Sequence, residues 1–167
     1  MIANPRRARV PYAPDLSLTT LAGEFINLEE LHGKVVLLDF WGTWCPPCLV
    51  ATPSLVDLYK RHTKGTGDGP QFEMIGVSSD PKAEEDKVRT YVEKNKMAWP
   101  QHLDATRQAQ RAFSINSYPT YIIVDAEGVV RERVTGWNDR ETKGRLDSMI
   151  KKLLKEGPPI APIPAKP

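Results

Sequence analysis

The hydrophobic and polar positions along the chain follow two alternating patterns, one typical of buried strands and one typical of helices. The segment 35–41 (VVLLDFW) is an apolar run interrupted by Asp39, and 72–79 (FEMIGVSS) is a second, mostly apolar segment. Runs of this length indicate strands that are buried on both faces of a sheet. The segment 120–135 (TYIIVDAEGVVRERVT) predicts two strands that turn at Glu127–Gly128.

Four further segments carry apolar residues at helical spacing. Helices are expected over 46–62, from Asp80–Pro81 onward, from Asp104 to about Phe113, and from a capping box of Asn138 and Glu141 to a stop at Gly157. Asp80 and Asp104 are the expected N-caps of the second and third helices, because short polar side chains accept hydrogen bonds from the free N–H groups of a first turn. Pro81 fits the first helical position, where no N–H is needed.

The order of these segments predicts the fold class. The segment 16–28 (LSLTTLAGEFINL) indicates a β-hairpin that turns at Ala22–Gly23. Strands that alternate with helices, followed by a second hairpin and a closing helix, are typical of an α/β sandwich around a mixed sheet. We place a single domain at 14–156, between a flexible arm at 1–13 and a Pro-rich disordered tail at 157–167.

Composition and charge exclude several classes of partner. The formal net charge of +2 is too small to indicate nucleic acid or an anionic membrane surface. No run of 18 apolar residues exists, so we expect no membrane span in this chain. The arm carries Arg6, Arg7 and Arg9 without an apolar stretch after them, which does not fit a secretory signal. Either the protein is cytoplasmic, or its export segment is absent from this chain; we also expect a monomer.

Both cysteines of the chain, Cys45 and Cys48, lie within the segment WGTWCPPCLVATP, with two prolines between them. A structural zinc site needs four ligands, but the histidines His32, His62 and His102 are scattered singly. Haem attachment requires His directly after the second cysteine, where Leu49 stands. Two inert core cysteines stay possible, and redox chemistry is the favoured interpretation.

The two prolines support a redox role. If a helix begins at Cys45, Pro46 and Pro47 occupy its first turn, where backbone N–H groups have no helical partner. Cys45 then lies at the positive end of the helix dipole, which stabilises its thiolate. Cys48, one turn inside, is expected to be shielded and less acidic. We therefore expect Cys45 to attack a partner's disulfide and Cys48 to resolve the mixed disulfide.

The stretch VVLLDFWGTWCPPC resembles the thioredoxin superfamily, and residues 14 to about 155 resemble its extracytoplasmic TlpA/ResA-like thiol–disulfide oxidoreductases. Asp39 stands six residues before Cys45, like the buried aspartate of thioredoxin, and Pro53 matches the proline that kinks the active-site helix. The motif SYPT at 117–120 matches the loop of the family's cis-proline, here Pro119. A peroxiredoxin-type site, by contrast, has Thr and Pro where this chain has Gly42 and Leu38.

This resemblance implies a thioredoxin-like three-layer sandwich, with an N-terminal hairpin and an inserted helix and strand before the cis-proline loop. It implies a proton acceptor at Asp39 for Cys48. It also implies a substrate-binding surface, which would consist of Trp44, Pro46, Tyr118 and Pro119. The partners would be a protein thiol or disulfide and an upstream electron donor, and we expect neither a cofactor nor a metal.

One position departs from the TlpA/ResA-like pattern. That group usually carries Glu three residues after the second cysteine, where this chain has Ala51, and often Asn where Asp39 stands. The acidic residue of this chain therefore stands at position 39, as in thioredoxin, and not at position 51. A thiol-based module that binds a partner or copper without turnover stays an alternative, and so does a cytoplasmic tryparedoxin- or nucleoredoxin-like reductase. Because the residues between the cysteines lack the His found in strong oxidants, we expect a reductant.

Overall fold

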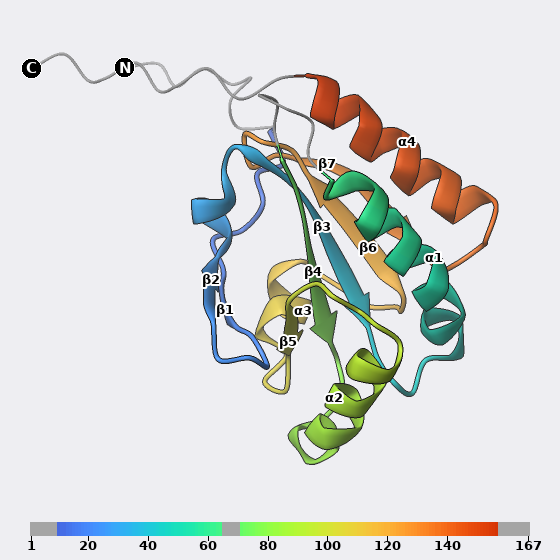
Figure 1. Cartoon of the computed structure of the whole chain (residues 1–167). Coiled ribbons are helices and arrows are strands. Elements are labelled where there is room, and N and C mark those ends of the chain that lie inside the picture. Colours follow the sequence, from blue (N-terminus) through green and yellow to red (C-terminus); the bar gives the residue numbers. More distant parts are fainter. Residues whose placement is uncertain (1–9, 65–70, 157–167) are drawn as a thin grey trace, which may run out of the picture.

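The computed structural model describes residues 10–64 and 71–156. Its elements follow one another as shown in Figure 1: β1 (Ser17–Thr19), β2 (Phe25–Asn27), the 3-10 helix η2 (Leu28–Leu31), β3 (Lys34–Trp41), α1 (Pro46–His62), β4 (Gln71–Ser78), the 3-10 helix η3 (Lys82–Glu84), α2 (Glu85–Lys94), β5 (Gln101–Leu103), α3 (Gln108–Ala112), β6 (Thr120–Val124), β7 (Val130–Thr135) and α4 (Glu141–Lys155). The expected strands, the N-terminal hairpin and the inserted helix and strand are all confirmed.

The central sheet is mixed, with strand order β5-β4-β3-β6-β7. Strands β3, β4 and β5 are parallel, whereas β6 runs antiparallel to β3 and pairs Thr120 with Phe40. The end of β3 and the start of β6 therefore lie at the same edge of the sheet. This topology brings the cysteine-bearing loop after β3 next to the proline loop before β6.

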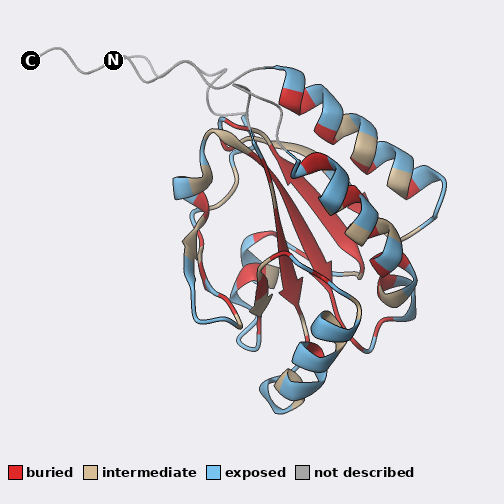
Figure 2. Cartoon of the chain, viewed as in Figure 1, coloured by how far each residue is buried: buried red, intermediate tan, exposed pale blue. Residues whose placement is uncertain are grey.

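The residues of β3 alternate between two buried layers, as a fully covered strand requires. Val35, Leu37 and Trp41 belong to the core that includes residues of α1, α2 and α4, whereas Val36 and Leu38 belong to the core under α3 and the N-terminal hairpin. Figure 2 shows the sheet buried between helices whose outer faces are exposed. These layers confirm the expected three-layer α/β sandwich.

Two of the residues expected as caps contact the start of a helix, but neither is its N-cap residue, since Arg107 is the N-cap of α3 and Arg140 that of α4. The Asp104 carboxylate accepts hydrogen bonds from the backbone N–H groups of Ala109 and Gln110, at the start of α3. Asn138 Oδ1 accepts from the N–H groups of Arg140 and Glu141, at the start of α4. The expected stop at Gly157 lies outside the described residues.

The expected cap at Asp80 is wrong. The helical segment does begin shortly after Pro81, as the short η3 followed by α2, but no side chain caps it. The Asp80 carboxylate instead accepts hydrogen bonds from Ser78 and from Thr43, in the loop after β3. These donors satisfy both carboxylate oxygens of Asp80 inside the protein, so neither oxygen is left to cap the helix.

The chain segment before β1 also pairs with the sheet. The N–H of Ala13 donates to the carbonyl of Gly128, and the N–H of Val130 donates to the carbonyl of Pro11. These contacts fall at the end of the range expected for the arm, whose residues 1–9 lie outside the described residues. The glycine-rich stretch 65–70 and the tail at 157–167 lie outside them as well.

Candidate active site

The loop after β3 turns directly into α1, and this turn carries both cysteines. Cys45 is the N-cap of α1, with extended backbone angles, and Pro46 and Pro47 occupy the first two helical positions. The missing proline N–H groups cost nothing there, since these positions have no helical acceptor. Cys45 and Cys48 are joined by a disulfide, with their Cα atoms 5.3 Å apart. The structure therefore represents the oxidised form of a pair that lies at the positive end of a helix dipole.

The two cysteines are equally shielded in this oxidised form. Cys45 is 2% exposed and Cys48 is 3% exposed, so the expected difference in shielding between the two is not visible here. A disulfide holds both side chains in one environment, and only the reduced form can separate them. Pro46 and Pro47 beside them are exposed at the surface.

Asp39 is buried in β3, the strand that leads into this turn. Its side chain lies on the same face of β3 as Leu37 and Trp41, which is the face covered by α1. Neither carboxylate oxygen has a hydrogen-bond partner within the described residues. Burial raises the pKa of Asp39 from its ordinary value of 3.8 to about 7. A group with this pKa can both accept and release a proton near neutral pH.

Tyr121 is a polar neighbour of Asp39 to which the sequence analysis assigned no role. It pairs with Asp39 across β3 and β6, so both side chains point to the same face of the sheet. Burial, followed by the charge of Asp39, raises the pKa of its hydroxyl, which therefore stays protonated at neutral pH. The signal in the sequence was a tyrosine within an otherwise aliphatic run, YIIV at 121–124.

Trp44, the residue before Cys45, is exposed, whereas Trp41 is buried in the core. Trp44 is 54% exposed, and its indole N–H donates a hydrogen bond to Ser79 Oγ at 3.0 Å. Its ring meets the ring of Tyr118 edge-on, with centroids 5.4 Å apart. This contact joins the loop after β3 to the loop before β6.

The peptide bond between Tyr118 and Pro119 is cis, as the resemblance implied. Pro119 is buried, and its carbonyl accepts a hydrogen bond from the N–H of Gly136 at 2.8 Å. Tyr118 stays partly exposed beside Trp44. The structure therefore brings Cys45, Trp44 and the Tyr118–Pro119 loop together at one edge of the sheet.

A group that sequence reasoning did not find fixes the loop after β3. The Asp80 carboxylate, buried directly after β4, accepts from the backbone N–H of Thr43 at 2.9 Å and from its hydroxyl. The neighbouring Ser79 accepts from Trp44. No local pattern could reveal these contacts, because they join segments more than thirty residues apart.

The part of the chain that the structure describes has no cluster of three His, Cys, Asp or Glu side chains suited to a metal ion. In that same part, no helix combines the length and the apolar character needed to cross a membrane.

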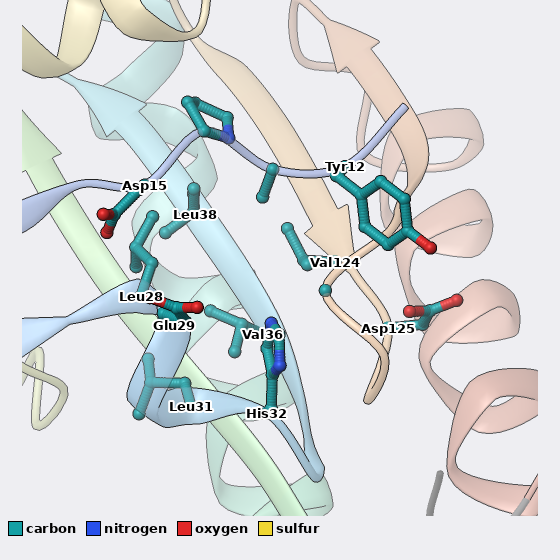
Figure 3. A pocket seen from close by; sticks show the side chains of 13 residues that line it. Tyr12, Asp15, Leu28, Glu29, Leu31, His32, Val36, Leu38, Val124 and Asp125 are labelled. Atoms are coloured by element: carbon teal, nitrogen blue, oxygen red, sulfur yellow. The ribbon is translucent and has the colours of Figure 1, made fainter. Parts of the chain in front are cut away.

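An apolar cavity of about 290 Å³ lies elsewhere, at the opposite end of β3. Figure 3 shows its lining: Leu28, Val36 and Leu38 contribute apolar side chains, and Tyr12 and Asp125 lie at its edge. Since Val36 is near the start of β3 and the cysteines follow its end, the cavity is not part of the redox site.

Comparisons with known proteins agree with this geometry. A family model described as the AhpC/TSA family matches residues 12–133. The thiol-disulfide oxidoreductase ResA of Bacillus cereus is 32% identical over 142 residues, which cover 84% of this chain and 76% of that protein. The solved structure of a thiol:disulfide interchange protein of the thioredoxin family from Chlorobium tepidum TLS superposes with a TM-score of 0.73 at 27% identity, covering 87% of this chain and 97% of that one.

The same fold occurs in the pneumococcal exposed lipoprotein thioredoxin Etrx1 of Streptococcus pneumoniae strain TIGR4, with a TM-score of 0.67 at 23% identity. This match covers 84% of this chain and all of that one. With a Cys-Pro-Pro-Cys disulfide at a helix start and a cis-proline loop beside it, the chain belongs to the AhpC/TSA family and, within it, to the thioredoxin-like, ResA-related thiol–disulfide oxidoreductases.

Proposed function

We propose that this oxidoreductase acts as a reductant of protein disulfides through the Cys45/Cys48 pair. The observation that carries the proposal is the disulfide at the N-terminus of α1, together with a buried carboxylate of raised pKa on β3, the strand that leads into it. The relatives named above are thiol–disulfide oxidoreductases, which supports the same chemistry here.

In the first step, the Cys45 thiolate attacks one sulfur of a partner's disulfide, and the other partner sulfur leaves as a thiolate that takes up a proton. In the second step, Asp39 accepts the proton of Cys48. The Cys48 thiolate then attacks Sγ of Cys45, and the second partner sulfur leaves as a thiolate that takes up a proton. The partner's disulfide is reduced to two thiols, and Cys45 and Cys48 end in the disulfide that the structure contains. A thiol reductant returns the pair to its reduced form.

The substrate-binding surface is proposed at the residues that surround the disulfide. Trp44 and Pro46 flank Cys45 in the sequence and are exposed, and the loop of Tyr118 and Pro119 lies against Trp44. An extended segment of a substrate protein could pair with the backbone of the cis-proline loop, in the manner of an added strand. The contact between Trp44 and Tyr118 supports a single continuous surface.

We also propose that the protein works outside the cytoplasm. The support is the resemblance to the extracytoplasmic TlpA/ResA-like group and the likeness in fold to a protein described as an exposed lipoprotein.

The reduction of insulin disulfides with dithiothreitol as electron donor tests the proposed function. We expect the wild-type protein to accelerate insulin precipitation, and we expect Cys45→Ser and Cys48→Ser to lose turnover. A wild-type protein that binds insulin without accelerating its reduction would favour the alternative of a thiol-based binding module.

A further inference from the structure

Two consecutive residues directly after β4, Ser79 and Asp80, contact the redox loop. We propose that Ser79 and Asp80 are positioning residues that hold the loop 42–44, and the exposed Trp44 indole, in the orientation in which a substrate protein docks. The inference rests on the proposed function, since it assumes that a protein disulfide approaches Cys45.

Asp80 fixes the middle of this loop. Asp80 is 1% exposed. Its carboxylate accepts hydrogen bonds from the N–H of Thr43 at 2.9 Å, from the Thr43 hydroxyl and from Ser78 Oγ at 2.7 Å. An ionised carboxylate is costly to bury unless donors such as these satisfy it, and hydrogen bonds to a charged acceptor are stronger than neutral ones. Two of the three donors belong to Thr43, which stands two residues before Cys45. Asp80 therefore anchors the chain immediately before the attacking cysteine.

Ser79 fixes both sides of Thr43. Its N–H and its hydroxyl donate to the carbonyl of Trp41, at 2.9 and 3.2 Å. Its hydroxyl oxygen accepts from the indole N–H of Trp44 at 3.0 Å. The two residues directly after β4 thus contact three of the four residues that lead into Cys45.

Gly42 shows how closely the indole is held. A Cβ atom at position 42 would lie 2.3 Å from Trp44 Nε1, so the ring lies directly over the glycine. Only a residue without a side chain leaves this space to the indole. The Trp44 indole therefore contacts Gly42, Ser79 and Tyr118, and more than half of the residue stays exposed.

An exposed aromatic ring that is ordered before binding suits a docking surface. Ordering a loop and a large side chain at the moment of association reduces affinity, and a prearranged surface avoids that cost. A small disulfide makes no such contact and needs only access to Cys45. The role of Ser79 and Asp80 is therefore expected in reactions with protein disulfides and not in reactions with small ones.

The test compares two rate constants in the full chain, for the reduced protein with insulin and with the small disulfide 5,5′-dithiobis(2-nitrobenzoate). We expect Asp80→Asn and Thr43→Val to lower the insulin rate constant about 10-fold and to change the small-disulfide rate constant less than about 2-fold. Thr43→Val keeps the charge of Asp80, so the pair of variants separates position from charge. Thr43→Ser keeps both donors and should restore the wild-type ratio.

Asp125→Asn is the matched control. Asp125 also accepts from two backbone N–H groups and an arginine, but it lies by the β6–β7 turn, away from the redox loop. This variant should lose stability without changing the ratio of the two rate constants. The indole N–H resonance of Trp44 adds a direct signature, since its protection from hydrogen exchange should fall in Asp80→Asn and Thr43→Val and stay in Asp125→Asn.

Rate constants that fall equally for both disulfides, or an unchanged ratio with unchanged Trp44 protection, would overturn the inference while leaving the proposed function intact. A wild-type protein that reduces the small disulfide but not insulin would overturn the proposed function, and this inference with it.

Discussion

Among single residues, Asp39 links the structure of the site to its chemistry most directly. Its carboxylate is buried without a hydrogen-bond partner among the described residues, which is a costly arrangement unless the group is neutral. Burial raises its pKa to about 7, so near neutral pH a substantial fraction of the molecules holds it ionised and another holds it protonated. A group with this balance suits the transfer of the Cys48 proton.

If Asp39 is that proton acceptor, Asp39→Asn should leave the first attack by Cys45 nearly unchanged. It should slow the resolution of the mixed disulfide by about 10- to 100-fold near neutral pH, the low end of what a positioned base supplies. Single-turnover kinetics with a preformed mixed disulfide measure this step. Equal slowing of both steps would assign Asp39 to the packing of the loop.

Adding Ala51→Glu to the Asp39→Asn variant should restore part of the rate of resolution, because Ala51 is buried one helical turn after Cys48.

The raised pKa of Asp39 also predicts a pH dependence of stability. Between pH 4 and 7 the unfolded chain releases this proton while the folded protein keeps it, so the free energy of unfolding falls as the pH rises. The shift from 3.8 to about 7 corresponds to a loss of roughly 4 kcal/mol. Asp39→Asn should therefore match the oxidised wild type near pH 4 and exceed its stability by several kcal/mol near pH 8.

Urea unfolding of both oxidised proteins at several pH values measures this difference, in which the other titrating groups cancel. A stability difference that does not change with pH would show that Asp39 does not titrate in this range.

At the scale of elements, the start of α1 sets the reactivity of the thiols. Cys45 is the N-cap and Cys48 lies one turn inside, so the helix dipole acts mainly on Cys45. We expect the pKa of Cys45 in the reduced protein to fall below the free value of about 8.5, into the range of roughly 6 to 8. The rate of alkylation against pH gives this value, and Cys48 should be largely unreactive in the same experiment. Equal reactivity of the two thiols would contradict their assigned roles.

The elements themselves could be predicted from local patterns. The apolar run at 35–41 became β3, and the helix expected over 46–62 became α1 with the same ends. The local signals are strong because a doubly covered strand needs continuous apolar residues and a helix start tolerates two prolines.

The contacts between elements could not be predicted in the same way. Asp80 has the sequence context of an N-cap, yet its carboxylate binds Thr43 across the gap between two parallel strands. Tyr121 looks like one more strand residue until the register places it opposite Asp39. In both cases the partner is set by strand order and register, which a single local pattern does not encode.

At the scale of the whole molecule, the mixed sheet assembles the site from distant segments. Because β6 runs antiparallel to β3, the Tyr118–Pro119 loop meets the Cys45 turn at one edge, with Trp44 in contact with Tyr118. The parallel strand β4 adds Ser79 and Asp80 to the same edge. This edge of the sheet is where we propose that a protein substrate docks. The two prolines between the cysteines lack the His that strong oxidants carry.

The trapping of a mixed disulfide with insulin tests the central claim most directly, because it identifies both the attacking sulfur and the class of substrate. Oxidised insulin is incubated with the reduced Cys48→Ser and Cys45→Ser variants, and the products are analysed by mass spectrometry after acid quenching. We predict a covalent complex through Cys45 in Cys48→Ser and none in Cys45→Ser. A complex through Cys48, or none with either variant, would contradict the account.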